Sequence, residues 1–383
     1  MRHLIKISIV TGTRAESGIL TPVIQAISKQ PLFKFSVICS GQHFDRSRGY
    51  TANLVKDLTP NFYSVKGLPP SDLPVRSIES LGKIVGGFGR VLAKVKPHWL
   101  LILGDHADPL AAALAATYLG GIAIAHIHGG EVTGHRQDDR VRYVLSSLAH
   151  MHFVATMKCR ERLLKVGEAH WRIHLVGAPA VDRIHSHLLP SVDEVKKKYG
   201  LPSGPYIFLT QHPVPEQHQE AAKQIKATLR AIDAVGLPVI ASLPNSNVGG
   251  EAALKILSAR HGANFLVHPN IEHLDYLALL KGAAALVGNS SSGIIEAPSF
   301  KTPVVNIGIR QAGRERCENV IDAPHGASAI EKAIRKALSS NFKSKCSRLV
   351  SPYGNGTASY KIANCLAKTT INQDLFDKRV LLP

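Results

Sequence analysis

The chain has 383 residues, of which 45% are hydrophobic and 19% charged, and 46 Lys and Arg against 28 Asp and Glu give a net charge of +18. This composition is too apolar for a disordered chain, and the length exceeds one ordinary core, so two domains are predicted. The five cysteines are scattered without CxxC spacing or a Cys-His cluster, which disfavours both a disulfide scaffold and a zinc finger.

The two apolar segments that come closest to a signal peptide or a membrane-spanning helix fit neither. The N-terminal apolar run, residues 7–10, is too short for the core of a signal peptide. The richest stretch, residues 109–125, is interrupted by Gly120 and Gly121, so it does not predict a membrane-spanning helix. The sequence therefore predicts a cytoplasmic protein without a membrane partner.

The first half of the chain alternates short β-branched runs with helix-length amphipathic segments. The runs that predict strands are residues 5–10, 35–39, 99–103, 122–125 and 152–155. This alternation is typical of βαβ units and a parallel sheet.

A long apolar stripe between the second and third of these strands predicts a helix packed on the sheet. Its members recur at helical spacing and stop before Pro97: Ile78, Leu81, Ile84, Val85, Phe88, Val91, Leu92 and Val95. We interpret the stripe as core.

The alternation restarts after a Pro-rich, charged stretch at residues 188–205, which predicts a domain boundary there. The second set of predicted strands comprises residues 206–209, 239–242, 264–267, 284–287 and 303–307. The sequence thus predicts two successive doubly wound α/β units, with the cleft between them as the natural ligand site.

A serine-rich loop follows one strand of the second half, at residues 288–293. Ser290, Ser291 and Ser292 precede a short apolar segment, so hydroxyls and free N–H groups are expected at a helix start that suits phosphate. An ordinary serine N-cap explains the loop about equally well. The nearby arginines Arg310, Arg314 and Arg316 favour phosphate, since guanidinium groups match its oxygens. No Walker or GxGxxG pattern predicts ATP or a nicotinamide cofactor.

Acidic and histidine side chains crowd into thirty-five residues after two strands of the first half. They are Asp105, His106, Asp108, His126, His128, Glu131, His135, Asp138 and Asp139. Two chemistries explain this density: a metal site built on His126 and His128, or metal-free proton transfer between carboxyl groups with separated pKa values. No third ligand has a motif-like spacing, so we favour the metal-free alternative. One of Asp138 and Asp139 is expected to cap the helix that begins there.

A basic stretch late in the chain is interpreted as a solvated helix face. It comprises Lys332, Arg335, Lys336, Lys343, Lys345 and Arg348. The stretch contains a single aromatic residue, Phe342, on which a base could stack, and it has no groove-reading motif. No specific nucleic-acid partner is therefore predicted.

Taken in order, these motifs resemble those of the UDP-N-acetylglucosamine 2-epimerases, and within them the hydrolysing enzymes of sialic-acid pathways. The likeness covers most of the chain. The motifs that carry it are Thr11-Gly12-Thr13-Arg14-Ala15-Glu16, Gly104-Asp105, His126-Ile127-His128-Gly129-Gly130-Glu131, Asp138-Asp139, Gln211-His212-Pro213, residues 288–296, Arg310-Gln311-Ala312-Gly313-Arg314 and Tyr353-Gly354-Asn355-Gly356.

The resemblance implies two Rossmann-like doubly wound domains of the glycosyltransferase-B type with an interdomain cleft. The N-terminal domain is expected at residues 1–190 and carries the acid and base groups. The C-terminal domain, residues 191–365, is expected to bind the nucleotide diphosphate, and residues 366–383 are expected to pack back on the first domain.

The resemblance also implies the reaction. A proton leaves C2 of the sugar and UDP leaves C1, giving a 2-acetamidoglucal, and water then adds to give N-acetylmannosamine. The implied substrate is UDP-N-acetylglucosamine or a related UDP- or GDP-linked 2-acetamido sugar. The implied enzyme needs no cofactor and no metal, and it is a homodimer or homotetramer.

Site roles follow from the same resemblance. The residues given catalytic roles are Asp105, Glu131, Asp138, Asp139 and His212, the last of which would steady the diphosphate. The residues expected to contact substrate are Arg14, Glu16, His43, His128, Asn245, Ser290, Ser291, Ser292, Gly293, Glu296, Arg310 and Arg314. His212 is also explained as a plain turn residue before Pro213.

Several positions depart from the family pattern and leave alternatives open. His106 stands where Arg is usual, Tyr143 where His is frequent, and Asn247 where Asp is common, while His128 is Glu in some relatives. The alternatives are a non-hydrolysing 2-epimerase, a glycosyltransferase, a catalytically silent nucleotide-sugar-binding protein and, on charge alone, a nucleic-acid-binding module.

Overall fold

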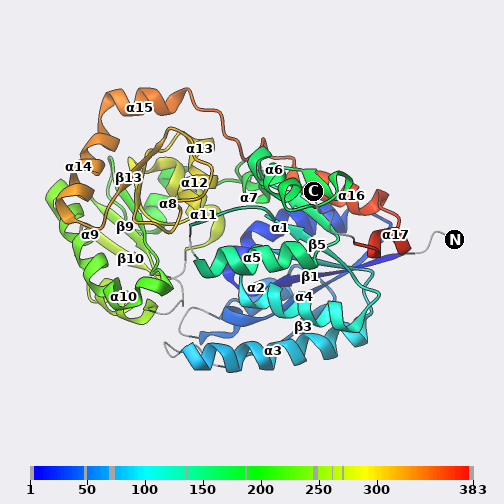
Figure 1. Cartoon of the computed structure of the whole chain (residues 1–383). Helices are drawn as coiled ribbons and strands as arrows, with labels where there is room; N and C mark the ends of the chain where they lie inside the picture. The colour runs from blue at the N-terminus through cyan, green and yellow to red at the C-terminus, as the bar shows by residue number, and fades with distance from the viewer. Residues whose placement is uncertain are drawn as a thin grey trace. The chain divides into compact units, whose positions relative to one another are not determined.

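The computed structural model describes residues 4–46, 50–68, 74–134, 136–185, 188–244, 249–260, 262–269 and 271–378 (Figure 1). The chain forms two compact units. Unit 1 comprises Met1–Val132, Arg136–His185 and Tyr353–Pro383, and unit 2 comprises Thr133–His135 and Ser186–Pro352.

The chain rejoins unit 1 at Tyr353, earlier than the predicted return at residue 366. Ala178 N–H donates to the Tyr353 carbonyl at 2.8 Å, and the Asp182 carboxylate accepts the N–H groups of Ala358 and Ser359 at 3.0 and 2.6 Å. The two Asp182 bonds cap a helix that begins at Ala358 and whose Ile362 is fully buried in the core of unit 1. The return therefore begins shortly before this helix.

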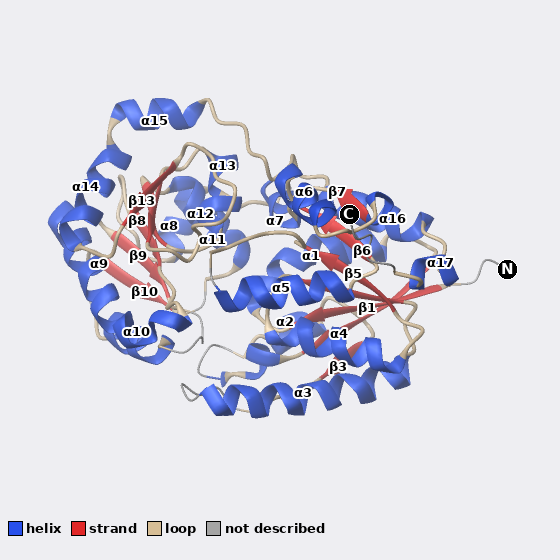
Figure 2. Cartoon of the chain, viewed as in Figure 1, coloured by secondary structure: helices blue, strands red, loops and turns tan. Residues whose placement is uncertain are grey.

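Unit 1 is built on a seven-stranded parallel sheet (Figure 2). Its strands are β1 Ile5–Thr11, β2 Phe33–Cys39, β3 Phe62–Ser64, β4 Trp99–Leu103, β5 Ala123–Ile127, β6 Met151–Val154 and β7 Ile173–Leu175. Their order, β3-β2-β1-β4-β5-β6-β7, is that of a doubly wound Rossmann-like domain.

Helices cover both faces of this sheet. They are α1 Arg14–Ser28, η1 Gly41–Phe44, α2 Ala52–Lys56, α3 Pro74–Val95, α4 Ala107–Leu119, α5 Arg136–Leu148, α6 Met157–Lys165, η3 His170–Arg172, α7 Pro179–Ile184, α16 Ala358–Lys368 and α17 Gln373–Phe376. Successive residues of β4 point to opposite faces, so Leu101 joins the cluster beneath α1 and α16, whereas Leu100 and Ile102 join the cluster beneath α3 and α4.

Unit 2 repeats the plan with a six-stranded parallel sheet in the order β10-β9-β8-β11-β12-β13. Its strands are β8 Ile207–Thr210, β9 Val239–Ser242, β10 Phe265–His268, β11 Ala285–Gly288, β12 Val304–Ile307 and β13 Val320–Ala323. Its helices are α8 Val192–Lys198, η4 Pro215–Glu220, α9 Ala221–Val235, α10 Gly250–Ser258, α11 His273–Gly282, α12 Ser292–Ile295, α13 Ala297–Phe300, α14 Ala327–Leu338 and α15 Ser340–Ser347. The predicted α/β class with two doubly wound units is confirmed.

The prediction and the structure differ at the edges. The strands β3, β7 and β13 were not predicted, because each has three or four residues and only partial burial. The helix α3 was predicted, but Ile78 in its first turns is 69% exposed and does not belong to the core, which takes Ile84, Phe88 and Leu92.

The basic stretch of the second half lies on α14 and α15 and in the residue that follows α15. All six of its predicted members are exposed, and Arg335 and Lys345 pair with Glu331 and Glu318. This agrees with a solvated helix face. Among the described residues, no helix combines the length and the apolar character needed to cross a membrane.

Candidate active site

The predicted site residues of unit 1 lie in the segments that follow three neighbouring strands, β1, β4 and β5. The carboxyl ends of parallel strands meet at one edge of a sheet, so the loops after them lie together. Gly12 to Arg14 follow β1, Asp105 follows β4, and Glu131 follows β5. This edge therefore gathers the groups that the sequence had placed far apart.

Arg142 on α5 ties two of the predicted acids together. Its guanidinium forms an ion pair with Asp105, and Nη1 lies 4.0 Å from Oε2 of Glu131. The side chains of Arg142, Glu131 and Asp105 are only 2%, 3% and 11% exposed. The nearby carboxylates raise the pKa of Arg142 against the effect of burial, so the guanidinium stays charged.

Sequence reasoning missed Arg142. The signal was present, because Arg142 follows Asp138 by four residues and so shares a helix face with it. Carboxylates buried this close together need a cation to neutralise them, and Arg142 supplies it.

Glu131 is also held by His128, whose Nδ1 contacts its Oε1. His128 has a φ of +67°, and its carbonyl accepts a hydrogen bond from Arg142 at 2.9 Å. This left-handed backbone turns the ring of His128 back onto Glu131. The structure therefore places His128, predicted to contact substrate, as a partner of a predicted acid.

His126 belongs to the support of the site. It is fully buried in β5, and its Nε2 lies 2.8 Å from the carbonyl of Gly104. Burial lowers the pKa of His126 to about 3, so the ring is neutral. Among the residues that the structure describes, no group of three or more His, Cys, Asp or Glu side chains is placed to hold a metal ion.

Asp138 and Asp139 lie in the first turn of α5, which begins at Arg136. The expectation that one of them caps this helix was wrong, because both have helical positions inside it. There they interact favourably with the positive end of the helix dipole and with Arg142. His135 lies outside the described residues.

Glu16 is built into the loop after β1. It forms a capping box with Thr13, and its Oε2 accepts the N–H groups of Gly12 and Thr13 at 2.7 and 3.2 Å. Arg14 is the first residue of the same helix. Glu16, predicted to contact substrate, is 5% exposed and shapes the loop that carries Arg14.

His43, which was predicted to contact substrate, is held inside unit 1. It is fully buried, and both ring nitrogens are engaged by hydroxyl groups, Nε2 by Thr11 at 3.0 Å and Nδ1 by Thr51 at 2.8 Å. His43 instead joins the end of β1 to the segment before α2.

In unit 2, Asn289 connects the loops after β8 and β11. Its side chain accepts the N–H of His212 at 2.7 Å and donates to the carbonyl of His212 at 2.8 Å. The carbonyl of Asn289 accepts hydrogen bonds from Arg310 at 3.0 Å and from Gln311 at 3.1 Å. Asn289 is 2% exposed and was missed as a site residue, although it stands inside the predicted serine loop.

The serine loop is organised by Tyr276 of α11. The Tyr276 hydroxyl lies 2.6 Å from Ser292 Oγ, which donates to Ser290 Oγ at 3.0 Å. Ser291 precedes α12, but its side chain makes no cap bond and has no hydrogen-bond partner among the described residues. Ser290 and Ser292 are thus held as a hydrogen-bonded pair, and the hydroxyl of Ser291 is available for a ligand.

The helix predicted to start after the serine loop is a single turn. It covers Ser292–Ile295 before the chain kinks at Glu296, and Pro298 lies in the first turn of α13. Because a single turn has a small dipole, any anion binding here depends mainly on hydroxyl and arginine groups.

Gly293 and Glu296, both predicted to contact substrate, lie close to other residues of unit 2. A Cβ on Gly293 would approach Val304 Cγ1 to 2.8 Å, so this glycine allows α12 to pack on the sheet. The Glu296 side chain is 9% exposed and lies 3.6 Å from Nε2 of His273. Asn245 lies outside the described residues, and so does Asn247.

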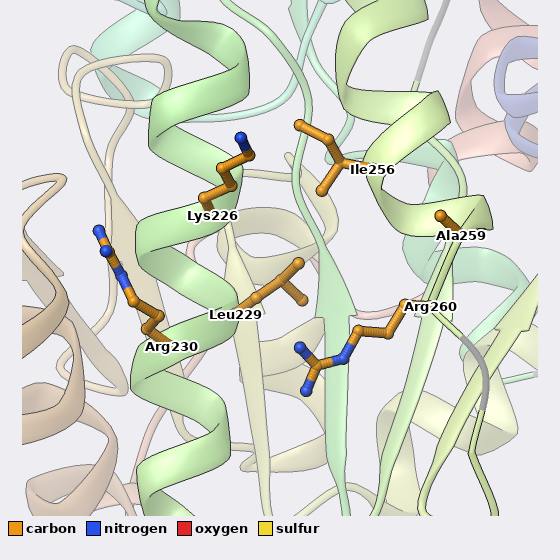
Figure 3. A pocket seen from close by; sticks show the side chains of 6 residues that line it. All are labelled: Lys226, Leu229, Arg230, Ile256, Ala259 and Arg260. Carbon is orange, nitrogen blue, oxygen red and sulfur yellow. The ribbon is translucent and has the colours of Figure 1, made fainter.

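A hollow of about 390 Å³ lies on unit 2 between α9 and α10 (Figure 3). It is lined by Lys226, Leu229, Arg230, Ile256, Ala259 and Arg260. Arg260 pairs with Asp233 and stacks on Phe265. Because α10 ends just before β10 begins, this end of the hollow lies at the amino edge of the strands. None of the predicted site residues that the structure describes lines it.

Comparison with known proteins identifies the family. The family model described as UDP-N-acetylglucosamine 2-epimerase matches residues 25–367. The chain is 35% identical to a UDP-N,N'-diacetylbacillosamine 2-epimerase (hydrolyzing) of Legionella pneumophila, over 97% of this chain and 98% of the relative. It is 33% identical to a UDP-N-acetylglucosamine 2-epimerase of Neisseria meningitidis, over 87% and 88%.

Solved structures agree on the fold. The crystal structure of UDP-GlcNAc 2-epimerase from Neisseria meningitidis bound to UDP-GlcNAc matches with a TM-score of 0.80 and 20% identity, over 95% of this chain and 100% of that chain. The match to the family model spans most of the sequence, and the sheet orders match the predicted architecture. The chain therefore belongs to the UDP-N-acetylglucosamine 2-epimerase family.

Proposed function

We propose that this chain is a hydrolysing nucleotide-sugar 2-epimerase. The observation that carries the proposal is the buried group of Asp105, Glu131 and Arg142 at the carboxyl edge of the unit 1 sheet. Removal of a weakly acidic C–H proton needs positioned carboxylates, and this edge supplies them. The hydrolysing Legionella relative, alike over nearly its whole length, supports the same reaction class.

In the proposed reaction, a carboxylate of unit 1 takes the proton from C2 of a 2-acetamido sugar while the C1–O bond to the nucleoside diphosphate breaks. The electron pair of the C–H bond forms the C1–C2 double bond of a 2-acetamidoglucal. Water then adds across that bond, with its oxygen at C1 and a proton returned to the opposite face of C2. Asp105 and Glu131 are the proposed proton carriers, and Asp138 or Asp139 serves as a further acid or base.

Unit 2 is proposed to hold the leaving diphosphate. Arg310 and Ser291 offer a guanidinium and a hydroxyl beside Asn289, which connects the loops after β8 and β11. Arg314 follows in the same loop as Arg310. Cationic donors that strengthen their contacts as the C1–O bond breaks favour the transition state. Arg14 and His212 complete the proposed diphosphate contacts, and Glu296 is the proposed acceptor for the ribose hydroxyls.

The proposed substrate is UDP-N-acetylglucosamine or a related UDP- or GDP-linked 2-acetamido sugar. A panel of these nucleotide-sugars incubated with the protein in deuterated water and followed by NMR tests substrate and reaction together. The expected result is release of the nucleoside diphosphate, a free sugar with inverted C2 and one solvent deuterium at C2.

Other outcomes of this assay select the alternatives. Formation of an epimerised sugar still linked to nucleotide indicates the alternative, a non-hydrolysing 2-epimerase. Binding of UDP without any exchange at C2 over the whole panel, at high protein concentration, contradicts an epimerase and indicates a silent nucleotide-sugar-binding protein.

We further propose that the protein acts in the cytoplasm as a homodimer or homotetramer, as its resemblance to the family implies. Light scattering coupled to gel filtration measures the assembly, and fractionation of producing cells measures the location. A monomer at micromolar concentration contradicts the first proposal, and recovery outside the cytoplasmic fraction contradicts the second.

A further inference from the structure

His106 stands among four carboxyl groups of unit 1. It directly precedes α4, and its Nε2 lies 3.9 Å from Oε1 of Glu16. Asp105, Asp108 and Asp138 are the other acids that act on it. Its side chain is 33% exposed, whereas that of Glu16 is 7% exposed, so His106 is the solvent-facing member of this pair.

Glu16 is the acceptor that shapes the loop after β1. Its Oε2 receives the two N–H groups of Gly12 and Thr13, and among the described residues its buried Oε1 has no hydrogen-bond partner. An ionised carboxylate accepts such bonds more strongly than a protonated one. The charge on Glu16 therefore determines how firmly the loop carrying Arg14 is held.

Asp108 braces the same loop from the other side. A Cβ on Gly12 would lie 2.3 Å from its Oδ2, and a Cβ on Gly41, which has a φ of +56°, would lie 2.7 Å away. The carboxyl group is thus wedged against the backbone of two loops and is 7% exposed. Glu16 and Asp108 are two buried acids that meet at Gly12, with His106 as the cation that acts on both.

We propose that His106 is a titratable positioning residue whose positive charge keeps Glu16 ionised and thereby fixes the Gly12 to Arg14 loop. The proposal deepens the proposed function, since Arg14 is a proposed diphosphate contact. At pH values where Glu16 becomes protonated, the loop loosens. With a neutral side chain at position 106, the loop should loosen at a higher pH than in the wild type. With a permanent cation there, the pH of loosening should not rise.

The electrostatics agree with this geometry. Burial and, to a smaller extent, Asp108 raise the pKa of Glu16 to about 7, although His106 and the N–H groups of Gly12 and Thr13 act to lower it. Burial lowers the pKa of His106, but Glu16, Asp105, Asp138 and Asp108 together raise it above its ordinary value. These acids come from α1, the β4–α4 turn, α4 and α5, so four segments of unit 1 contribute negative charge at His106.

The test compares three single variants with the wild type across the pH range near neutrality. His106→Gln removes the charge, His106→Arg makes it permanent, and His98→Gln is the matched control at the opposite end of β4. The first measurement is the protection of the Gly12 and Thr13 amides against hydrogen exchange, which requires no turnover. The second is the acid limb of kcat/KM with the nucleotide-sugar that the product assay identifies.

In the wild type we expect amide protection and kcat/KM to fall together as pH drops through the titration of Glu16. His106→Gln should move both midpoints upward by about one pH unit, as expected for loss of one neighbouring charge. His106→Arg should not raise them, and His98→Gln should leave them in place. Glu16→Gln keeps a capping-box acceptor without a titrating group, so it should abolish the pH dependence of protection.

Equal midpoints in the wild type and His106→Gln would overturn the proposal, and so would an equal upward move in His106→Arg. A midpoint shift in amide protection without any turnover supports the role of His106 and contradicts the proposed enzyme. Turnover with unshifted midpoints supports the proposed enzyme and contradicts the role of His106.

Discussion

Arg142 and Asp105 form an ion pair inside unit 1, and the same guanidinium lies 4.0 Å from Glu131. One buried cation thus serves two carboxylates that we propose as proton carriers. Its pairing offsets the mutual repulsion that would otherwise drive one of them to take up a proton. The ion pair also joins the turn after β4 to helix α5, so the acids are positioned by a contact that is distant in sequence.

Replacing Arg142 with Met should destabilise unit 1 strongly. Removing one partner of a buried ion pair leaves an uncompensated charge, which costs about 3–5 kcal/mol. Urea unfolding measures this change, with the exposed Arg140→Met as the matched control on the same helix. Adding Asp105→Asn to Arg142→Met should recover part of the loss, because the orphaned carboxylate is then gone. Equal unfolding midpoints for Arg142→Met and Arg140→Met would contradict the pairing.

Much of the fold could be predicted because strand and helix periodicities are local. The five predicted strands of the first half correspond to β1, β2, β4, β5 and β6, and the long stripe corresponds to α3. The edge strands such as β13 escaped prediction, because a half-buried strand has little hydrophobic pattern. Ile78 followed the helical spacing but is exposed, since the first turns of α3 lie beyond the cluster that Ile84 joins.

The site was harder to predict, because a residue type does not show which of its atoms are already engaged. His43 and His128 were both predicted to contact substrate, yet hydroxyl groups occupy the ring of His43, and His128 holds Glu131. Asn289 acts through hydrogen bonds to the backbone of His212, which depend on the meeting of β8 and β11. Such tertiary contacts leave no periodic signal in the sequence.

The junction of β8 and β11 should not tolerate a side chain at Gly288. Its φ is +136°, and a Cβ there would lie 2.0 Å from the carbonyl oxygen of Thr210. Gly288→Ala should therefore lower the free energy of unfolding by about 1–3 kcal/mol or more, because backbone must move. Gly326→Ala, where a Cβ meets nothing within 4 Å, is the control. Thermal unfolding compares the two variants, and equal melting temperatures would refute the clash.

Asn289→Ala should weaken UDP binding more than its effect on stability alone accounts for. The variant loses both bonds to His212 and leaves those backbone groups buried, which costs about 1–3 kcal/mol. It also releases the loop whose carbonyl orients Arg310. Calorimetric titration with UDP measures affinity, and Asn319→Ala, another buried asparagine of unit 2, which bonds the Thr302 carbonyl, is the matched control. Unchanged UDP affinity in Asn289→Ala would argue against the junction as part of the binding site.

Acid should destabilise the protein in part through His43. Burial lowers the pKa of His43 to about 4 from its ordinary value of 6.5, so the folded state resists a proton that the unfolded chain accepts. Stability from this group is present above pH 6.5 and is lost as pH falls toward 4, by roughly 3 kcal/mol in the limit. His43→Gln should flatten this part of the profile, measured by urea unfolding at several pH values. The exposed His218→Gln should keep the wild-type slope, and a wild-type slope in His43→Gln would exclude this contribution.

The C-terminal segment should hold α5 in place through Lys378. Its ammonium donates to the carbonyls of Ser146, Ser147 and Ala149 at 2.8, 2.8 and 2.7 Å and pairs with Glu168 at 2.6 Å. A cation at the end of a helix satisfies the last carbonyls and interacts favourably with the dipole.

Lys378→Met should therefore lower the free energy of unfolding by about 1–3 kcal/mol and speed amide exchange in the last turn of α5. Because α5 also carries Arg142, turnover should fall, whereas UDP binding should stay unchanged, since its proposed contacts lie on unit 2 and on Arg14 and none lies on α5. Lys368→Met, an exposed lysine at the end of α16, is the control for both measurements. If exchange in α5 matched the control, Lys378 would serve only to anchor the chain terminus, and the acids of unit 1 would depend on α5 without help from the C-terminal segment.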